Sequence, residues 1–118
     1  MKTIGILGGM SWESSLIYYQ NVNQLIKNRL GGLHSAKVVM VSVDFGPIEK
    51  LMRAENWDQV AKQLIESAQQ VQAGGADLML IATNTMHKMY DQIQKAVIIP
   101  IIHIADVAGD AASSLEYS

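Results

Sequence analysis

The sequence predicts an α/β domain with a parallel four-stranded sheet, in the flavodoxin-like strand order 2-1-3-4 and with helices on both faces. Three observations lead to this prediction. Apolar runs of strand length alternate with longer segments whose apolar residues recur at helical spacing. Glycine pairs at 8–9, 31–32 and 74–75 separate several of these segments. The resulting βαβαβαβα order requires right-handed crossovers, and therefore parallel strands.

The composition limits which classes of protein fit. At 118 residues and 12.9 kDa, the chain is expected to form one domain over residues 1–118, and a hydrophobic content of 49% is enough for a folded core. A net charge of −2 without a run of like charges argues against nucleic acid as a partner. No apolar stretch reaches the roughly 18 residues of a membrane span, so no membrane association is expected.

The chain contains no cysteine. It therefore has neither a disulfide framework nor a thiolate metal site. No other metal site is predicted, because His34 and His103 have no further ligands at metal spacing and are more often structural. Met1 leads directly into an apolar strand and glycines, which is unlike a signal peptide. A cytoplasmic protein fits these features best.

The N-terminal half is predicted to contain a strand, a helix and a second strand. Residues 2–7 form a short apolar strand, and Ser11 is a suitable N-cap for a helix over 12–30. We expect Trp12 to face the core together with the other apolar residues of this helix. These residues stand at positions 12, 16, 19, 22, 26 and 30. Residues 37–43 form the valine-rich second strand.

The C-terminal half continues the alternation. A short helical turn at 48–53 is expected within a longer loop, and Asn56 is expected to cap a helix that ends at Gly74. The remaining elements are a strand from about 77 to 82, a helix over 85–95, a strand within 97–102 and a weaker helix over 106–115.

Polar residues follow the third strand without a break. The run 78–82 is apolar, and Thr83, Asn84, Thr85 and His87 come directly after it. In open α/β sheets, ligands bind at the carboxyl ends of the strands. With strands 1 and 3 as neighbours, the loop 8–11 and these polar residues lie side by side, so the sequence predicts a small-molecule site there.

The first loop is a weaker signal when taken alone. Its glycines match neither G-x-G-x-x-G nor the P-loop pattern, so a nucleotide is not indicated. Backbone N–H groups at a helix start suit a small anion such as a carboxylate. Gly8 and Gly9 could equally serve only a tight turn. Two such helix starts facing each other would suit a ligand with two anionic groups.

Three further side chains are expected near this edge, and each could have a structural or solvent-exposed position instead of a binding role. Asp44 follows the second strand and can hold a loop by accepting N–H bonds. Arg53, expected on a loop over the site, could bind a substrate carboxylate in a bidentate manner, although a single exposed arginine more often lies in solvent. His87 could orient a neighbouring side chain or simply cover the sheet edge.

Several motifs together resemble the aspartate/glutamate racemase family. They occur in the family's order over the whole chain, and the combination is specific. The matching segments are Gly8-Gly9-Met10-Ser11-Trp12-Glu13-Ser14 with Tyr18-Tyr19, Gly32-Leu33-His34-Ser35-Ala36, Ser42-Val43-Asp44-Phe45, Gly75-Ala76-Asp77, Thr83-Asn84-Thr85-Met86-His87-Lys88 and Pro100-Ile101-Ile102-His103-Ile104.

The resemblance implies a cofactor-independent amino-acid racemase with two similar α/β domains and the active site between them. In that family, two cysteines face opposite sides of the substrate Cα, one removing the α-proton and the other returning a proton. Substrate carboxylates are held by loop amides and by the Asn-Thr pair. These binding roles would fall on Asn84, Thr85, Met10 and Ser11. Members often form dimers, so the resemblance also implies a homodimer.

The chain departs from the family pattern at the first catalytic position. Thr83 stands where the first cysteine is expected, as in some other members of the group. A threonine hydroxyl can donate a proton to a carbanion but is a very poor base at neutral pH. We therefore expect an enzyme of this type to work preferentially in one direction.

The second departure concerns length. The chain ends at Ser118, about where the family's second domain should begin, so the second cysteine is not in these 118 residues. The chain is expected to supply one half of an active site and to be inactive alone. The alternative is a non-catalytic module that binds a small dicarboxylate or assembles with a partner.

Overall fold

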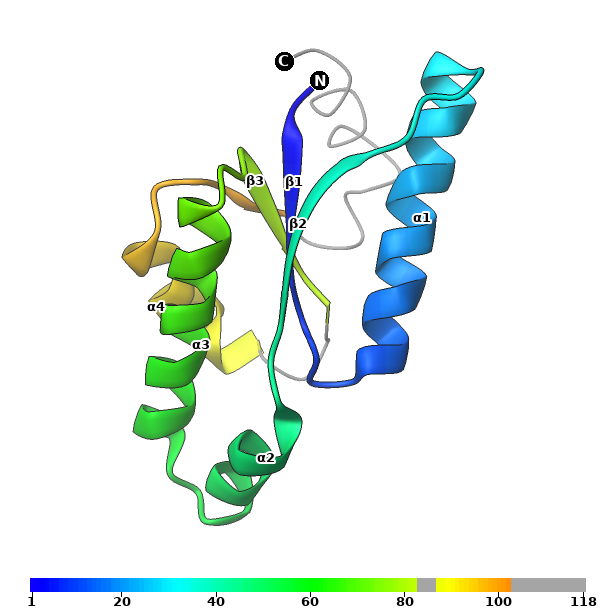
Figure 1. The fold of residues 1–118 in the computed structure, drawn as a ribbon. Helices are drawn as coiled ribbons and strands as arrows, with labels where there is room; N and C mark the ends of the chain where they lie inside the picture. The colour runs from blue at the N-terminus through cyan, green and yellow to red at the C-terminus, as the bar shows by residue number, and fades with distance from the viewer. Residues whose placement is uncertain (83–86, 103–118) are drawn as a thin grey trace.

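The computed structural model describes residues 1–82 and 87–102 (Figure 1). The expected alternation of strands and helices is present in this part of the chain. The elements are β1 (Thr3–Gly8), α1 (Trp12–Leu30), β2 (Lys37–Ser42), α2 (Phe45–Arg53), α3 (Trp57–Ala73), β3 (Leu78–Ile81), α4 (His87–Ala96) and β4 (Ile101–Ile102). The helix expected over 106–115 lies outside the described residues.

The four strands form one parallel sheet in the order β2-β1-β3-β4, which confirms the predicted topology. β1 is buried at every position because it has a neighbouring strand on both sides and helices on both faces. Its register pairs Gly8 with Ser42 of β2 and Leu7 with Ile81 of β3. The carboxyl ends of these three strands therefore meet at one edge, at the lower side of Figure 1.

The two faces of the sheet have separate hydrophobic cores. α1 covers one face, and α3 and α4 cover the other, as Figure 1 shows. The core under α1 is smaller, and its fully buried residues include Ile4, Ile6, Val22 and Ile26. The core on the other face includes Leu7, Ile48, Val60, Leu64, Val71, Met79 and Ile93. The predicted arrangement of helices on both faces is confirmed.

The predicted buried stripe of α1 is wrong for four of its six residues. Trp12, Leu16, Tyr19 and Leu30 are exposed, and only Val22 and Ile26 are buried as expected. The stripe that faces the sheet also includes Ser15 and Tyr18, one turn apart. Both stripes have helical spacing, so the periodicity could not distinguish the face that packs against the sheet from a neighbouring face.

The segment after β2 is more regular than expected. Instead of a helical turn inside a loop, Phe45–Arg53 is a continuous helix, α2. Asp44 caps it, because its Oδ1 accepts the N–H of Gly46 at 3.2 Å. Asn56 occupies the N-cap of α3 as predicted, but its side chain makes no capping hydrogen bond.

The last described strand is shorter than the apolar run that predicted it. Only Ile101–Ile102 pair with β3. Upstream, Gln72 Oε1 accepts the N–H of Ile98 at 2.6 Å and that of Ile99 at 3.4 Å. Pro100 has no N–H to offer a strand ladder. The N–H groups of Ile98 and Ile99 are therefore bound by a side chain of α3, whereas the carbonyl of Pro100 accepts the N–H of Met79 in β3 at 2.9 Å.

Candidate functional site

The carboxyl ends of β1 and β3 are held side by side, which is the arrangement that the predicted site requires. The N–H of Ala82 donates to the carbonyl of Leu7 at 2.9 Å, and the N–H of Val43 donates to the carbonyl of Gly8 at 2.8 Å. Ala82 directly precedes Thr83 in the sequence. The chain thus enters the predicted polar motif next to the first glycine loop.

The first loop is fixed by close backbone packing. Gly9 has φ +97°, a left-handed conformation that favours glycine. A Cβ on Gly9 would collide with the backbone N and O of Val43, and a Cβ on Gly8 would collide with the hydroxyl of Ser15. Both glycines are therefore required by the contacts of the loop with β2 and α1, whatever the loop binds.

Ser15 ties this loop to α1, and the sequence analysis missed it. Its Oγ accepts the buried N–H of Gly9 at 2.9 Å and donates to the carbonyl of Ser11 at 3.4 Å. The side chain is 3% exposed. A small polar residue on the sheet-facing stripe of α1, one turn before Tyr18, was the signal that could have identified it. Ser15 uses the Gly9 N–H, so that donor is not available to a ligand.

Donors remain at the start of α1. Within the described residues, no hydrogen bond uses the backbone N–H of Met10, Ser11, Trp12 or Glu13. Consecutive N–H groups at a helix N-terminus attract anions, because they donate hydrogen bonds and lie at the positive end of the helix dipole. The loop can thus provide the small-anion cradle that the sequence suggested, one residue later than its glycines.

The side chains of Met10 and Ser11 are occupied by structural contacts. Met10 is 6% exposed and belongs to the core on the α3 face. The Ser11 hydroxyl accepts the N–H of Ser14 at 3.4 Å and donates to Glu13 Oε2 at 3.3 Å, so it is the predicted N-cap of α1. Any contact of Met10 or Ser11 with a ligand would therefore use the backbone N–H.

Arg53 lies at the end of α2 and not on a loop, which corrects the expectation. Its side chain is 69% exposed, and its Nε lies 2.9 Å from Glu49 Oε1, one helical turn earlier. Figure 1 shows α2 beyond the end of β2, at the edge where the strands terminate. Asp44 makes the kind of N–H bond expected of it, but that bond caps α2. A role for Arg53 or Asp44 in binding stays a prediction.

The polar motif after β3 lies largely outside the described residues. This applies to Thr83, Asn84 and Thr85. His87 is the first residue of α4, but its side chain also lies outside the description. In residues 1–82 and 87–102, no three His, Asp or Glu side chains are grouped as metal ligands would be. No helix in the same part of the chain has the length and apolar character needed to cross a membrane.

Known proteins with this fold and sequence are racemases or their relatives. The family model of the Asp/Glu/Hydantoin racemases matches residues 7–117. The broad specificity amino-acid racemase RacX of Bacillus subtilis (strain 168) is 26% identical over 104 residues, which cover 87% of this chain and 46% of that protein.

Two crystal structures are similar along nearly the whole chain. A Yersinia pestis protein assigned to the Asp/Glu racemases superposes with a TM-score of 0.86 at 47% identity, over 91% of this chain and 46% of that one. An aspartate racemase homologue from Pyrococcus horikoshii superposes with a TM-score of 0.81 at 29% identity, over 97% of this chain and 50% of that one. The chain spans about half the length of these relatives. By its sequence and its fold, it belongs to the Asp/Glu/Hydantoin racemase family.

Proposed function

We propose that this chain supplies one half of the active site of a cofactor-independent racemase acting on aspartate or glutamate. The observation that carries the proposal is the family match over residues 7–117, which includes both the loop 8–11 and the motif beginning at Thr83. The meeting of β1 and β3 at one edge supports it, because Ala82, which precedes Thr83 in the sequence, is hydrogen-bonded to Leu7, which precedes the loop 8–11.

The proposed substrate contacts follow from which groups remain able to bind an anion. The backbone N–H groups of Met10 and Ser11 hold one carboxylate, together with the side chains of Asn84 and Thr85. Arg53 reaches a second carboxylate by exchanging its partner Glu49, a surface ion pair that is worth little by itself. His87 and Asp44 act as supporting residues. Four consecutive backbone N–H donors suit a small dicarboxylic amino acid better than a nucleotide.

Thr83 is the proposed acid on one side of the substrate Cα. Its hydroxyl donates a proton to the carbanion formed when a base on the other side removes the α-proton, and water replaces the proton on Thr83 as it is donated, releasing hydroxide. The reverse step requires the alkoxide of Thr83, which is too high in energy at neutral pH to form readily. The proposed enzyme therefore exchanges the α-proton of one enantiomer much faster than that of the other, while the kcat/KM values for racemisation in the two directions stay equal because the equilibrium constant is 1.

The opposite base would come from a second α/β domain. The relatives are about twice as long as these 118 residues, and the chain itself has no cysteine to act as a thiolate. We propose that the isolated 118 residues bind substrate weakly and do not racemise it. A cytoplasmic location is part of the same proposal, because a thiol base needs a reducing compartment.

The test separates proton exchange from inversion. The longest natural polypeptide containing these residues is incubated in D₂O with each enantiomer of aspartate and glutamate, and NMR and chiral chromatography follow the α-position. We expect inversion of both enantiomers, with deuterium incorporated into the unconverted substrate from one enantiomer only. In Thr83→Ala, the opposite base still exchanges the α-proton, but inversion is lost because no acid remains on the second face.

Thr83→Cys sharpens the test, since a thiol can serve as both acid and base. This variant should bring the rates of α-proton exchange from the two enantiomers close together, whereas Ser35→Ala, at the opposite end of the sheet, should leave these rates unchanged. Comparable rates of α-proton exchange into both unconverted enantiomers in the unaltered protein would overturn the assigned role of Thr83. Binding without exchange would favour the alternative, a non-catalytic dicarboxylate-binding or assembly module.

A further inference from the structure

Two buried residues in the described part of the chain carry a short hydroxyl side chain. Thr3 begins β1 at one end of the sheet, and Ser15 lies at the other end, beside the loop 8–11. A buried hydroxyl is costly unless it is hydrogen-bonded. The Ser15 hydroxyl makes its hydrogen bonds to the loop, one with the N–H of Gly9 and one with the carbonyl of Ser11. Within the described residues, its polarity is used for this loop alone.

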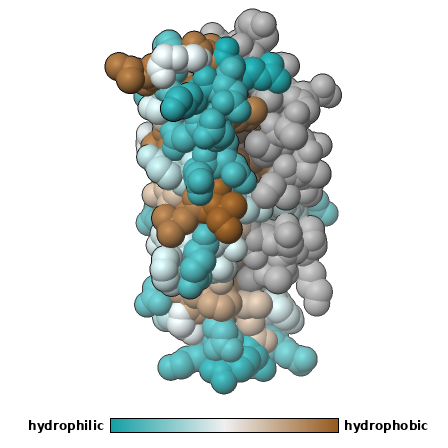
Figure 2. All heavy atoms as spheres, turned by 90° about the vertical axis from the view of Figure 1, so that its right-hand side faces the viewer, coloured by the Kyte–Doolittle hydropathy of each residue, from teal (hydrophilic) through white to brown (hydrophobic). Residues whose placement is uncertain are grey.

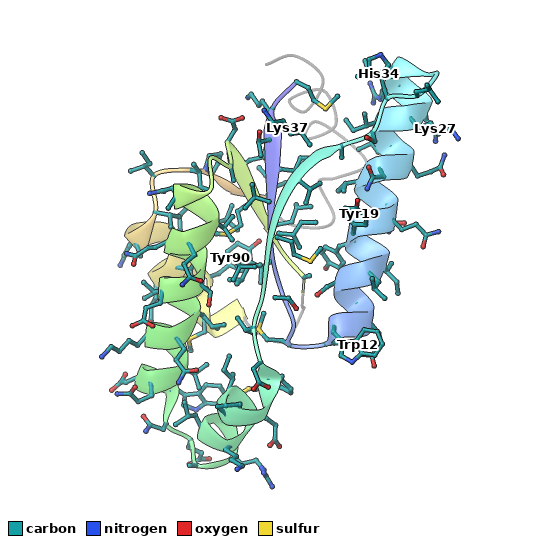
Figure 3. The ribbon with its side chains drawn as sticks, in the orientation of Figure 1. Trp12, Tyr19, Lys27, His34, Lys37 and Tyr90 are labelled. Carbon is teal, nitrogen blue, oxygen red and sulfur yellow. The ribbon has the colours of Figure 1, made fainter. Side chains whose placement is uncertain are left out.

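The position of Ser15 on α1 keeps its hydroxyl away from water. Figure 2 shows the outer face of α1, whereas Ser15 belongs to the sheet-facing stripe together with Tyr18. Figure 3 shows Trp12, the first residue of α1, at the end of the helix that joins the loop. Ser15 follows about one turn later on the buried side. Water therefore competes little for the two hydrogen bonds.

These two bonds enclose Met10. One joins Ser15 to the N–H of Gly9 and the other joins it to the carbonyl of Ser11, so the peptide groups before and after Met10 lie between two points held by one side chain. These peptide groups carry the N–H of Met10 and the N–H of Ser11, which no hydrogen bond uses within the described residues. Ser15 thus constrains the directions of two unused donors.

The loop has other contacts that do not depend on Ser15. The side chain of Met10 is buried in the core on the α3 face. The carbonyl of Gly8 accepts the N–H of Val43 at 2.8 Å, and Gly9 packs closely against the backbone of the same residue. Without the Ser15 hydroxyl, these contacts still hold the loop at the edge of the sheet. What is lost is the pair of hydrogen bonds that orients its unused N–H groups.

We propose that Ser15 is a substrate-positioning residue, which aims the N–H groups of Met10 and Ser11 at a substrate carboxylate without touching the substrate. This inference rests on the proposed function, which assigns carboxylate binding to these two groups. Donors that already have the binding geometry bind a ligand more tightly, because fewer groups become ordered on binding. The carboxylate is bound in the substrate and in the transition state alike, so Ser15 should act on KM and leave kcat nearly unchanged.

The test uses the full-length protein and two kinds of ligand. Chiral chromatography follows the racemisation of aspartate and glutamate and gives kcat and KM. Isothermal titration calorimetry gives the dissociation constant of succinate, a dicarboxylate that cannot be racemised. In Ser15→Ala, KM and the succinate dissociation constant should both rise about 10-fold, the effect of about one hydrogen bond, while kcat changes by less than about twofold.

Two further variants separate this role from a general loss of stability. Ser14→Ala is the matched control, because the Ser14 hydroxyl donates to the hydroxyl of Ser11 at 3.2 Å and not to the loop backbone. It should leave KM and the succinate dissociation constant unchanged. Ser15→Thr keeps a hydroxyl that can donate to the carbonyl four residues earlier, and should keep both constants within about threefold of the unaltered protein.

The outcomes distinguish this inference from the proposed function. Unchanged KM and succinate affinity in Ser15→Ala would overturn the inference, and so would a loss confined to kcat, which a smaller folded fraction would produce. An unaltered protein that binds succinate without racemising either amino acid would contradict the racemase proposal, and the succinate constants of the variants would still decide the role of Ser15. An unaltered protein that shows neither binding nor racemisation would overturn both.

Discussion

α1 and α3 lie on opposite faces of the same sheet, but they differ in how their apolar residues are used. α3 buries Val60, Leu64 and Val71 in the larger core and exposes polar and charged side chains. α1 buries a narrower stripe that includes Ser15 and leaves a second apolar stripe in solvent. A helix that only covers a sheet needs one apolar face. α1 therefore has a second apolar face, formed by Trp12, Leu16 and Tyr19, that the sheet does not cover. α3 has no corresponding exposed face.

The largest expected difference comes from the same substitution made in both helices. Leu64→Ala in α3 removes a fully buried side chain and should lower the free energy of unfolding by about 2–5 kcal/mol. Leu16→Ala in α1 removes an exposed one and should change it by less than about 0.5 kcal/mol. Chemical denaturation of samples dilute enough to remain monomeric measures both. Equal losses would mean that α1 packs as α3 does, and the comparison would fail.

A second prediction concerns how closely α3 approaches the central strand. A Cβ on Gly5 of β1 would collide with the side chain of Val71 and lie 2.9 Å from the Cβ of Ala76. Gly5→Ala should therefore lower the free energy of unfolding by about 1–3 kcal/mol through overpacking. Combining Gly5→Ala with Val71→Ala should recover part of this loss. An unchanged free energy of unfolding in Gly5→Ala would show that the space between α3 and β1 can hold an additional methyl group.

On the α1 face, the corresponding close contact is polar. Ser15→Ala leaves the buried N–H of Gly9 without its acceptor, which should cost about 1–3 kcal/mol. Hydrogen exchange of the Gly9 amide, followed by NMR, should accelerate in this variant and not in Ser14→Ala. If the Gly9 amide stayed equally protected, Ser15 would not be what holds the loop.

The smallest expected effect is confined to alkaline pH. Burial raises the pKa of Tyr18, on the sheet-facing stripe of α1, above its ordinary value of 10.0. Below that pH, the phenol is neutral in both states. Above it, the unfolded chain loses the proton first, so the free energy of unfolding falls as the pH rises. Tyr18→Phe should flatten this fall in alkaline denaturation experiments, and an unchanged slope would contradict the assignment.

Local patterns predicted a large part of the molecule. The strand order followed from the alternation of elements, because the handedness of parallel crossovers leaves few arrangements. The N-cap role of Ser11 was confirmed, since a side-chain oxygen at a helix start acts on nearby N–H groups. The end of β2 was predicted less well. Phe45–Arg53 contains Gly46 and Pro47, both poor residues for a helix interior, but they fall within its first turn.

In the candidate site, too, local patterns predicted some features and missed others. Spacing predicted that the loop 8–11 would stand beside the end of β3, and the strand register bears this out. It did not reveal that Ser15 takes the N–H of Gly9, or that the donors left over begin at Met10. Hydrogen bonds between a loop and a buried helix position depend on how closely the helix approaches the strand, and no local pattern contains that distance.

The sequence by itself determined the family, the order of strands and helices, and the edge of the sheet where the candidate site lies. These depend on periodicity, on turn residues and on motifs that act over short distances along the chain. The tertiary structure alone decided which side of α1 faces the sheet, because two stripes on this helix have the same period and only one of them can pack against the sheet. Trp12, Leu16 and Tyr19, on the other stripe, remain exposed.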